Sequence, residues 1–172
     1  HIKPGDVVLG LPSNGLHTNG YSFARKLFFE IGGYDVNDTT PELEKSVGLT
    51  LLEPHINYTN HVFSVLDKGI NVKGIAHITG GGLVENIPRI LPDGCGVNLN
   101  KGSWPSLPVF DVMQSIGDVD ENEMFRAFNM GIGMVFIMDS NTVSSVKDAL
   151  KDLTKVYEIG TVVRSEKVVE IK

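Results

Sequence analysis

Two segments of the chain place a histidine beside a glycine turn, a combination suited to proton transfer next to a bound anion. His77 begins the segment 77–89, which reads HITGGGLVENIPR, and His17 lies in the segment 10–22, which reads GLPSNGLHTNGYS. A histidine changes charge near neutral pH, so either ring is a candidate proton carrier. The alternative for each is a structural histidine that bonds to a backbone carbonyl.

Three consecutive glycines at positions 80–82 separate the apolar stretch 72–78 from a polar helix start. Glycine permits backbone N–H groups to face a ligand, and a helix N-terminus adds positive potential. We therefore predict an anion or substrate site here. Its predicted contacts are Thr79, Gly80, Gly81, Gly82, Glu85 and Asn86. The alternatives are a tight connection without a ligand and an i, i+4 ion pair between Glu85 and Arg89.

The segment 10–22 has the glycine spacing of a Walker phosphate loop, but Leu16 and His17 occupy the positions of its lysine and hydroxyl residue. Backbone N–H groups and polar side chains can still hold a phosphate. The predicted contacts are Ser13, Asn14, Gly15, Thr18 and Asn19. A polar loop that caps a helix is the alternative. A hydrolase nucleophile is excluded, because Leu11 stands where the Gly-x-Ser-x-Gly pattern requires glycine before Ser13.

Composition excludes several function classes. The 172 residues include 15 basic and 21 acidic side chains, with no basic stripe interleaved with aromatics, so we expect no nucleic-acid partner. No apolar run approaches the length of a membrane span. Cys95 is the only cysteine, and His55 and His61 are too far apart to share a helix face, so no metal site is predicted. The single thiol fits a cytoplasmic protein.

Strand and helix patterns alternate along the chain without a repeat. Strands are expected at 7–11, 72–78, 97–99, 134–138, 157–163 and 168–171. Helices are expected at 21–31, 42–52, 58–68, 109–116, 120–128 and 143–153. This predicts an α/β fold of the α+β type, a layered α/β/α sandwich over a mixed sheet that forms one domain over 1–172. The start at His1, without methionine, favours a piece of a longer protein, with a tag remnant as the alternative.

Three segments together resemble the aminoimidazole ribonucleotide synthetase family, also called phosphoribosylformylglycinamidine cyclo-ligases. They are 10–22, 77–89 and 128–134, the last of which reads FNMGIGM where the family has Phe-Asn-Cys/Met-Gly-Val/Ile-Gly-Met. Their order and spacing match along essentially the whole chain. The third segment adds Asn129 to the predicted substrate contacts.

The resemblance implies a C-terminal, substrate-side domain of an enzyme whose N-terminal domain forms a homodimer and holds most of the ATP and Mg²⁺ site. The full-length enzyme would convert formylglycinamidine ribonucleotide to aminoimidazole ribonucleotide, ADP and phosphate in purine biosynthesis, and this chain alone would be inactive. Phosphoryl transfer from ATP activates the formyl oxygen before the amidine nitrogen closes the ring, which leaves positioning and proton transfer to side chains. His17 and His77 would face the reacting end.

One segment departs from the family pattern. Residues 54–60 read PHINYTN where relatives have Pro-Thr-Arg/Lys-Ile-Tyr-Val-Lys, so two basic residues are missing while Tyr58 is retained. An anion contact from this segment is therefore in doubt, with His55 or His61 as possible substitutes.

Two other functions stay open. The chain can be a non-catalytic ligand-binding or assembly module, or a domain of another member of the same ATP-dependent superfamily, such as thiamine-monophosphate kinase or a hydrogenase-maturation protein. Binding of the substrate without binding of ATP would support a half-site.

Overall fold

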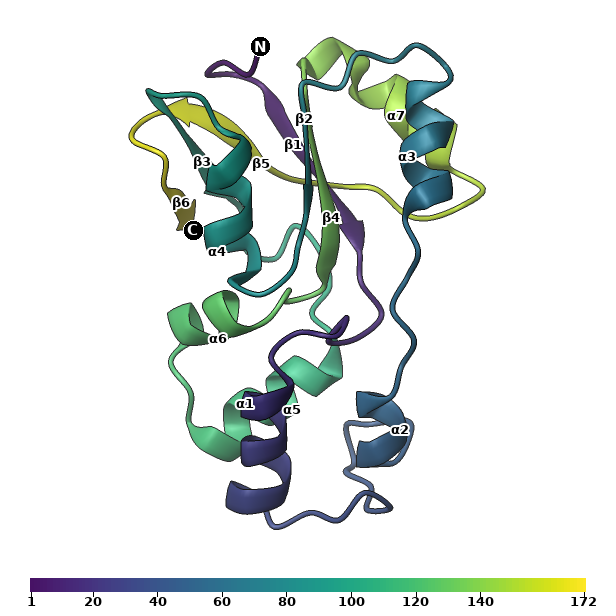
Figure 1. The fold of residues 1–172 in the computed structure, drawn as a ribbon, viewed down its shortest axis with the longest axis vertical. Coiled ribbons are helices and arrows are strands. Elements are labelled where there is room, and N and C mark those ends of the chain that lie inside the picture. The colour runs from purple at the N-terminus through teal and green to yellow at the C-terminus, as the bar shows by residue number, and fades with distance from the viewer.

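The computed structural model describes residues 1–172 and contains one six-stranded mixed sheet (Figure 1). Its strands are β1 (Val7–Pro12), β2 (Gly74–His77), β3 (Cys95–Leu99), β4 (Ile132–Met138), β5 (Tyr157–Arg164) and β6 (Val169–Ile171). The order is β2-β4-β1-β5-β3-β6, and only the β3–β6 pair is parallel. The predicted mixed sheet is confirmed.

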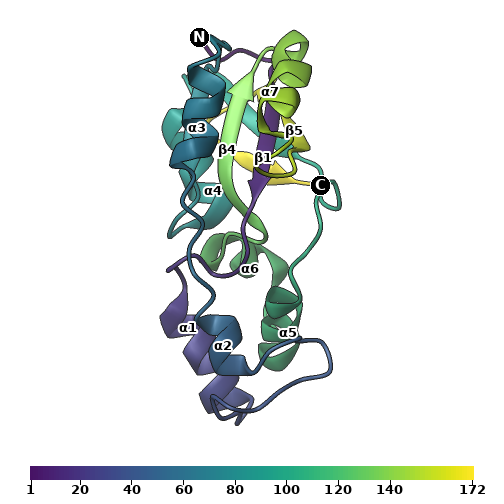
Figure 2. The same cartoon turned by 90° about the vertical axis from the view of Figure 1, so that its right-hand side faces the viewer.

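Helices cover both faces of this sheet, as the layered prediction requires. Helices α3 (Thr59–Leu66) and α7 (Val143–Leu150) lie side by side against one face (Figures 1 and 2). Alternate residues of β1 and β4, such as Leu9 and Phe136, pack against them. The opposite face contributes to a larger core that includes α4 (Gly82–Asn86).

The remaining helices form a second group beyond one end of the sheet (Figures 1 and 2). They are α1 (Tyr21–Arg25) with its π-helical continuation Lys26–Ile31, α2 (Val47–Leu51), α5 (Pro108–Gly117) and α6 (Glu121–Ala127). Phe28 and Phe110 are fully buried in the large core between them. The sequence patterns did not distinguish these helices from those on the sheet faces, since both kinds bury one apolar side.

The helix predicted over 42–52 is shorter in the structure, and the helix that follows the glycine turn is brief. The helix expected over 42–52 begins only after Ser46, whose hydroxyl accepts a hydrogen bond from the Leu49 N–H (3.4 Å) and caps α2. Helix α4 gives way after Asn86 to the 3₁₀ turn Ile87–Ile90, where Pro88 cannot continue the backbone hydrogen bonding. A second 3₁₀ turn, Ser140–Thr142, leads into α7. No helix is both long and apolar enough to cross a membrane.

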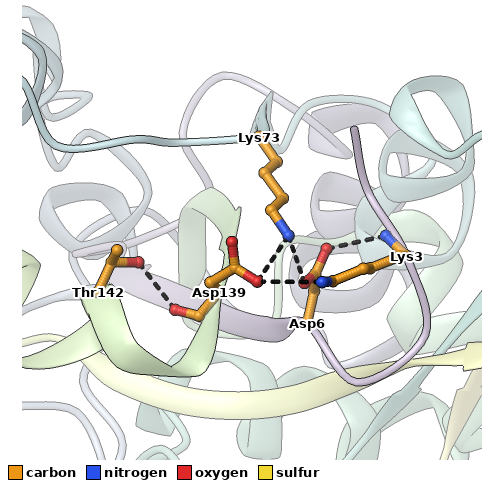
Figure 3. Close-up of polar contacts among 5 residues, drawn as sticks. All are labelled: Lys3, Asp6, Lys73, Asp139 and Thr142. Atoms are coloured by element: carbon orange, nitrogen blue, oxygen red, sulfur yellow. Dashed lines mark hydrogen bonds and ion pairs between the residues drawn. The ribbon is translucent and has the colours of Figure 1, made fainter.

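A buried ion-pair network joins the three neighbouring strands β2, β4 and β1 at one end of the sheet (Figure 3). The Lys73 ammonium, before β2, lies 2.7 Å from a carboxylate oxygen of Asp6, before β1, and 2.9 Å from one of Asp139, after β4. The Asp6 carboxylate also accepts a hydrogen bond from the Lys3 N–H (2.8 Å), and the Thr142 hydroxyl donates to the Asp139 carbonyl (2.8 Å).

Burial by itself lowers the pKa of Lys73, but the hydrogen bonds to Asp6 and Asp139 outweigh it and raise the pKa above its ordinary value. The ammonium therefore stays charged, and the network fixes the strand ends opposite to those that carry the sequence motifs.

Candidate active site

The three motif segments leave the same end of three adjacent strands. Segment 10–22 begins in the last residues of β1, His77 ends β2, and segment 128–134 leads into β4. Strand β4 lies between the other two strands and runs in the opposite direction. Backbone hydrogen bonds from the Ser13 N–H to the Gly131 carbonyl and from the Ile78 N–H to the Gly133 carbonyl, both 2.9 Å, extend the pairing past the strands. Strand order thus brings together segments that are distant in sequence.

Asn129 is the central brace of this arrangement. Its Oδ1 accepts hydrogen bonds from the Ser13 hydroxyl (2.7 Å) and the Gly131 N–H (2.9 Å), and its Nδ2 donates to the Gly15 carbonyl (2.8 Å). Asn129 and Ser13 are both buried. These hydrogen bonds hold the loop around Ser13 and Gly15 against the segment that contains Asn129. Direct contact of these residues with a substrate stays a prediction.

Gly133 provides the space for two ring side chains. A Cβ at this position would lie 2.1 Å from the Tyr58 hydroxyl oxygen and 3.0 Å from Cε1 of His17. The Tyr58 hydroxyl donates to the Pro12 carbonyl (2.6 Å), and burial raises the pKa of this phenol, so the proton stays on it. The second glycine of the FNMGIGM segment is therefore required by packing around the candidate site.

His17 lies inside the protein rather than at its surface, with a side chain that is 1% exposed and a backbone φ of 53°. Asn14 donates from Nδ2 to the Pro54 carbonyl (2.9 Å), which turns its Oδ1 toward Nε2 of His17, 2.5 Å away. The backbone N–H groups of Asn14 (3.3 Å) and Ile56 (3.5 Å) also point at Nε2 of His17, whereas the buried Nδ1 has no hydrogen-bond partner.

The pKa of His17 is lowered to about 4, first by burial and then by repulsion from His55 and His77. The ring is thus neutral at pH 7, and its free nitrogen is not exposed to solvent. Of the two candidate histidines, His17 is the one whose surroundings oppose proton exchange near neutral pH.

His77 is exposed, and its ring meets that of His55. The two Nε2 atoms are 3.1 Å apart, a hydrogen-bonding distance, and burial followed by repulsion from His55 lowers the pKa of His77. His55 also stacks on His17, with ring centroids 4.2 Å apart and planes 15° from parallel, and its Nδ1 lies 3.3 Å from the Thr18 hydroxyl. His55 was not among the predicted site residues, although the altered segment 54–60 had marked it as a substitute for missing basic residues.

An open pocket of about 520 Å³ lies beside the exposed pair of histidines. Its lining includes His55, Tyr58, Val62, Phe63, His77 and Met134. The volume is in the range of small-molecule sites, and no carboxylate lines the pocket. His77 therefore lies where a ligand can reach it, at the end of β2.

The glycine turn at 80–82 is built for packing. Gly81 and Gly82 have φ values of 95° and 57°, and a Cβ on Gly82 would lie 2.0 Å from the Phe125 carbonyl oxygen in α6. A carboxylate oxygen of Glu85 lies 2.5 Å from the Cβ position of Gly81, and the same carboxylate pairs with Arg126 at 3.8 Å. This negative charge opposes an anion at the turn, so the contacts favour the connector alternative, with Arg126 in place of Arg89 as the ion-pair partner.

Asn86 holds this turn from inside. Its Nδ2 donates to the carbonyls of Gly82 (2.8 Å), Gly80 (3.2 Å) and Thr79 (3.3 Å), and its Oδ1 accepts from the Thr79 hydroxyl (3.1 Å). The predicted loops 10–22 and 77–89 lie next to each other. Oδ1 of Asn19, in the first loop, is 3.7 Å from the Cβ position of Gly80, in the second. Asn19 itself donates to the His17 carbonyl (2.8 Å).

No group of three His, Cys, Asp or Glu side chains converges on one point, and Mg²⁺ prefers oxygen ligands such as carboxylates.

Comparison with known proteins identifies similar sequences along the whole chain. A family model described as AIR synthase related protein, C-terminal domain, matches residues 3–172. A phosphoribosylformylglycinamidine cyclo-ligase from a Thermoanaerobacter species is 46% identical over 166 residues, which are 96% of this chain and 49% of that protein. One from Caldanaerobacter subterraneus is 47% identical over 163 residues, covering 94% of this chain and 48% of that protein. The chain thus spans about half the length of these relatives.

Solved structures with low sequence identity share the fold. The hydrogenase maturation protein HypE of E. coli superimposes with a TM-score of 0.60 and 20% identity over 99% of this chain and 47% of that one. Thiamine-monophosphate kinase from Stenotrophomonas maltophilia gives a TM-score of 0.63 and 14% identity over 99% of this chain and 51% of that one.

Proposed function

Because the chain belongs to the AIR synthase related protein C-terminal domain family, we propose that it is the substrate-side half of an ATP-dependent cyclo-ligase of purine biosynthesis. The reaction would convert formylglycinamidine ribonucleotide to aminoimidazole ribonucleotide, ADP and phosphate. The observation that carries the proposal is the position of His77, an exposed histidine at a pocket that residues of two family-like segments, His77 and Met134, help to line.

The division of labour follows from what this chain offers. We assign ATP, Mg²⁺ and the contacts of a homodimer to the half of the relatives that lies outside the match, because the family resemblance implies that the N-terminal domain provides them. This chain supplies the side of the active site that binds the ribonucleotide. We propose that the protein works in the cytoplasm, a reducing compartment that suits the free Cys95.

His77 is the proposed proton acceptor. When the amidine nitrogen attacks the activated formyl carbon, that nitrogen must lose a proton, and the activated oxygen leaves as phosphate. The lowered pKa of His77 keeps its ring neutral near pH 7, the form that accepts a proton. His17 supports the site from inside, through its stack with His55.

A chimera tests the proposal. The unmatched half of the Thermoanaerobacter enzyme is joined to this chain, and ATP-dependent formation of aminoimidazole ribonucleotide is measured. We expect turnover, and we expect His77→Ala to lower kcat by at least about 100-fold, the usual contribution of a general base.

His61→Ala is the matched control. His61 contacts Tyr58, with ring centroids 5.4 Å apart, but does not line the pocket, so its loss should change kcat less than about threefold. Normal turnover in His77→Ala would remove the proton-transfer role, and a folded but inactive parent chimera would count against the assigned reaction.

A further inference from the structure

His55 makes a specific contact with each of the two histidines that the sequence singled out. Its ring covers the buried His17 by stacking at 4.2 Å, its Nε2 meets Nε2 of His77 at 3.1 Å, and its Nδ1 meets the Thr18 hydroxyl at 3.3 Å. The face of the His55 ring and both of its nitrogens therefore contact protein groups.

From these contacts we infer that His55 is a positioning residue, which fixes the ring of His77 through Nε2 so that proton exchange takes place at Nδ1 of His77. The inference rests on the proposed function of His77. Because the His55 contact occupies Nε2 of His77, only Nδ1 is left for a ligand.

The hydrogen-bond chain defines where each proton lies. For Nδ1 of His77 to accept a proton, Nε2–H of His77 must donate to Nε2 of His55. His55 then carries its own proton on Nδ1 and donates it to the Thr18 oxygen. The Thr18 hydroxyl oxygen is the last acceptor in this series of hydrogen bonds, and the Thr18 backbone has a φ of 69°, in the left-handed region.

No charged group competes with this arrangement. The titratable groups that face the three rings are the rings themselves and the Tyr58 phenol, which lies 6.2 Å from His77 between ring centroids and stays protonated. No carboxylate forms an ion pair with any histidine, and the nearby Glu53 pairs with Lys45. Orientation of His77 therefore depends on the neutral contact with His55.

Nitrogen-15 NMR of the imidazoles in the 172-residue chain tests the inference directly. At pH 7.5 we expect His77 as the Nε2–H form and His55 as the Nδ1–H form. In His55→Ala, His77 should change to a mixture of both tautomers and its pKa should rise, because the repulsion from His55 is lost.

His55→Gln separates orientation from charge. Its side-chain oxygen can accept the hydrogen bond from His77 without ever being charged, so the Nε2–H form of His77 should return while the pKa stays higher than in the unmodified chain. His61→Ala should leave the His77 tautomer unchanged. Thermal unfolding of each variant verifies that it is folded.

In the chimera, His55→Ala should lower kcat at least about tenfold with little change in KM, and His55→Gln should recover most of it, since a partner that fixes the tautomer acts on the chemical step. An unchanged His77 tautomer in folded His55→Ala would overturn the inference, whatever the chimera does. A shifted tautomer with unchanged kcat would instead count against His77 as the base.

Discussion

At the scale of single residues, the two histidines that share a motif pattern have opposite surroundings. His77 lies at the edge of a pocket, whereas His17 is sealed under His55 and bonded to Asn14. A buried neutral imidazole is costly to protonate, so it couples protein stability to pH. Identical residue types beside similar glycine loops therefore have different physical roles.

His17 should make the protein less stable in mild acid. Its pKa is about 4 in the folded chain and close to 6.5 when unfolded, so between these values the unfolded state binds more protons. The stability contribution is complete above about pH 6.5 and is lost as the pH falls toward 4, by about 1–3 kcal/mol. His61 and His77, whose pKa values are also lowered, add to the loss in the same direction.

Urea unfolding from pH 7.5 to 4.5 measures this effect. His17→Gln keeps a polar group but removes the titration, so its free energy of unfolding should fall less steeply with pH than that of the unmodified chain. Equal slopes in the two proteins would show that His17 is not the responsible group.

At the scale of elements, the glycine turn before α4 is determined by the helix packed against it. The nearest atoms to a Cβ on Gly82 are backbone atoms of Phe125 in α6 and of Phe128 directly after it, which cannot rotate away as a side chain does. The same turn in a sequence is equally compatible with a ligand site. In this structure the position of α6 favours a tight connection without a ligand over an anion site at this turn.

Gly82→Ala should lower the free energy of unfolding by at least about 2 kcal/mol, because it combines a positive φ with a clash against the Phe125 carbonyl. Gly80→Ala is the matched control, since its Cβ would meet no atom closer than 3.7 Å. Chemical denaturation compares them. A similar small loss in both variants would contradict the packing role.

At the scale of the whole molecule, the sheet has a structural end and a site end. Strands β2, β4 and β1 are joined at one end by Lys73, Asp6 and Asp139, and they carry the three motif segments at the other (Figures 1 and 3). Asp6 is 1% exposed, so its charge depends on Lys73 for compensation. The network thus holds in register the strands that assemble the candidate site.

Lys73→Met should cost about 3 kcal/mol of stability, because it leaves the buried Asp6 carboxylate without its cation. The double variant Asp6→Asn with Lys73→Met should recover part of that loss, since no buried charge is left unpaired. Thermal and urea unfolding provide the values. A double variant less stable than Lys73→Met alone would show that the charge is not what destabilises the single variant.

The sequence by itself determined the local features. Short apolar runs located all six strands within a few positions, and the three motif segments led to the correct family. These features depend on near neighbours along the chain, which is why periodicity and motif spacing reveal them.

Only the tertiary structure decided what the motif residues touch. Ser13 meets Asn129 across 116 positions, Asp6 meets Lys73 across 67, and His55 meets His77 across 22. Such contacts follow from the strand order β2-β4-β1, and the sequence patterns that locate a strand do not state which strand lies beside it. The chain alone therefore named the candidate histidines, and the packing of the sheet decided that His77 faces the pocket while His17 lies beneath His55.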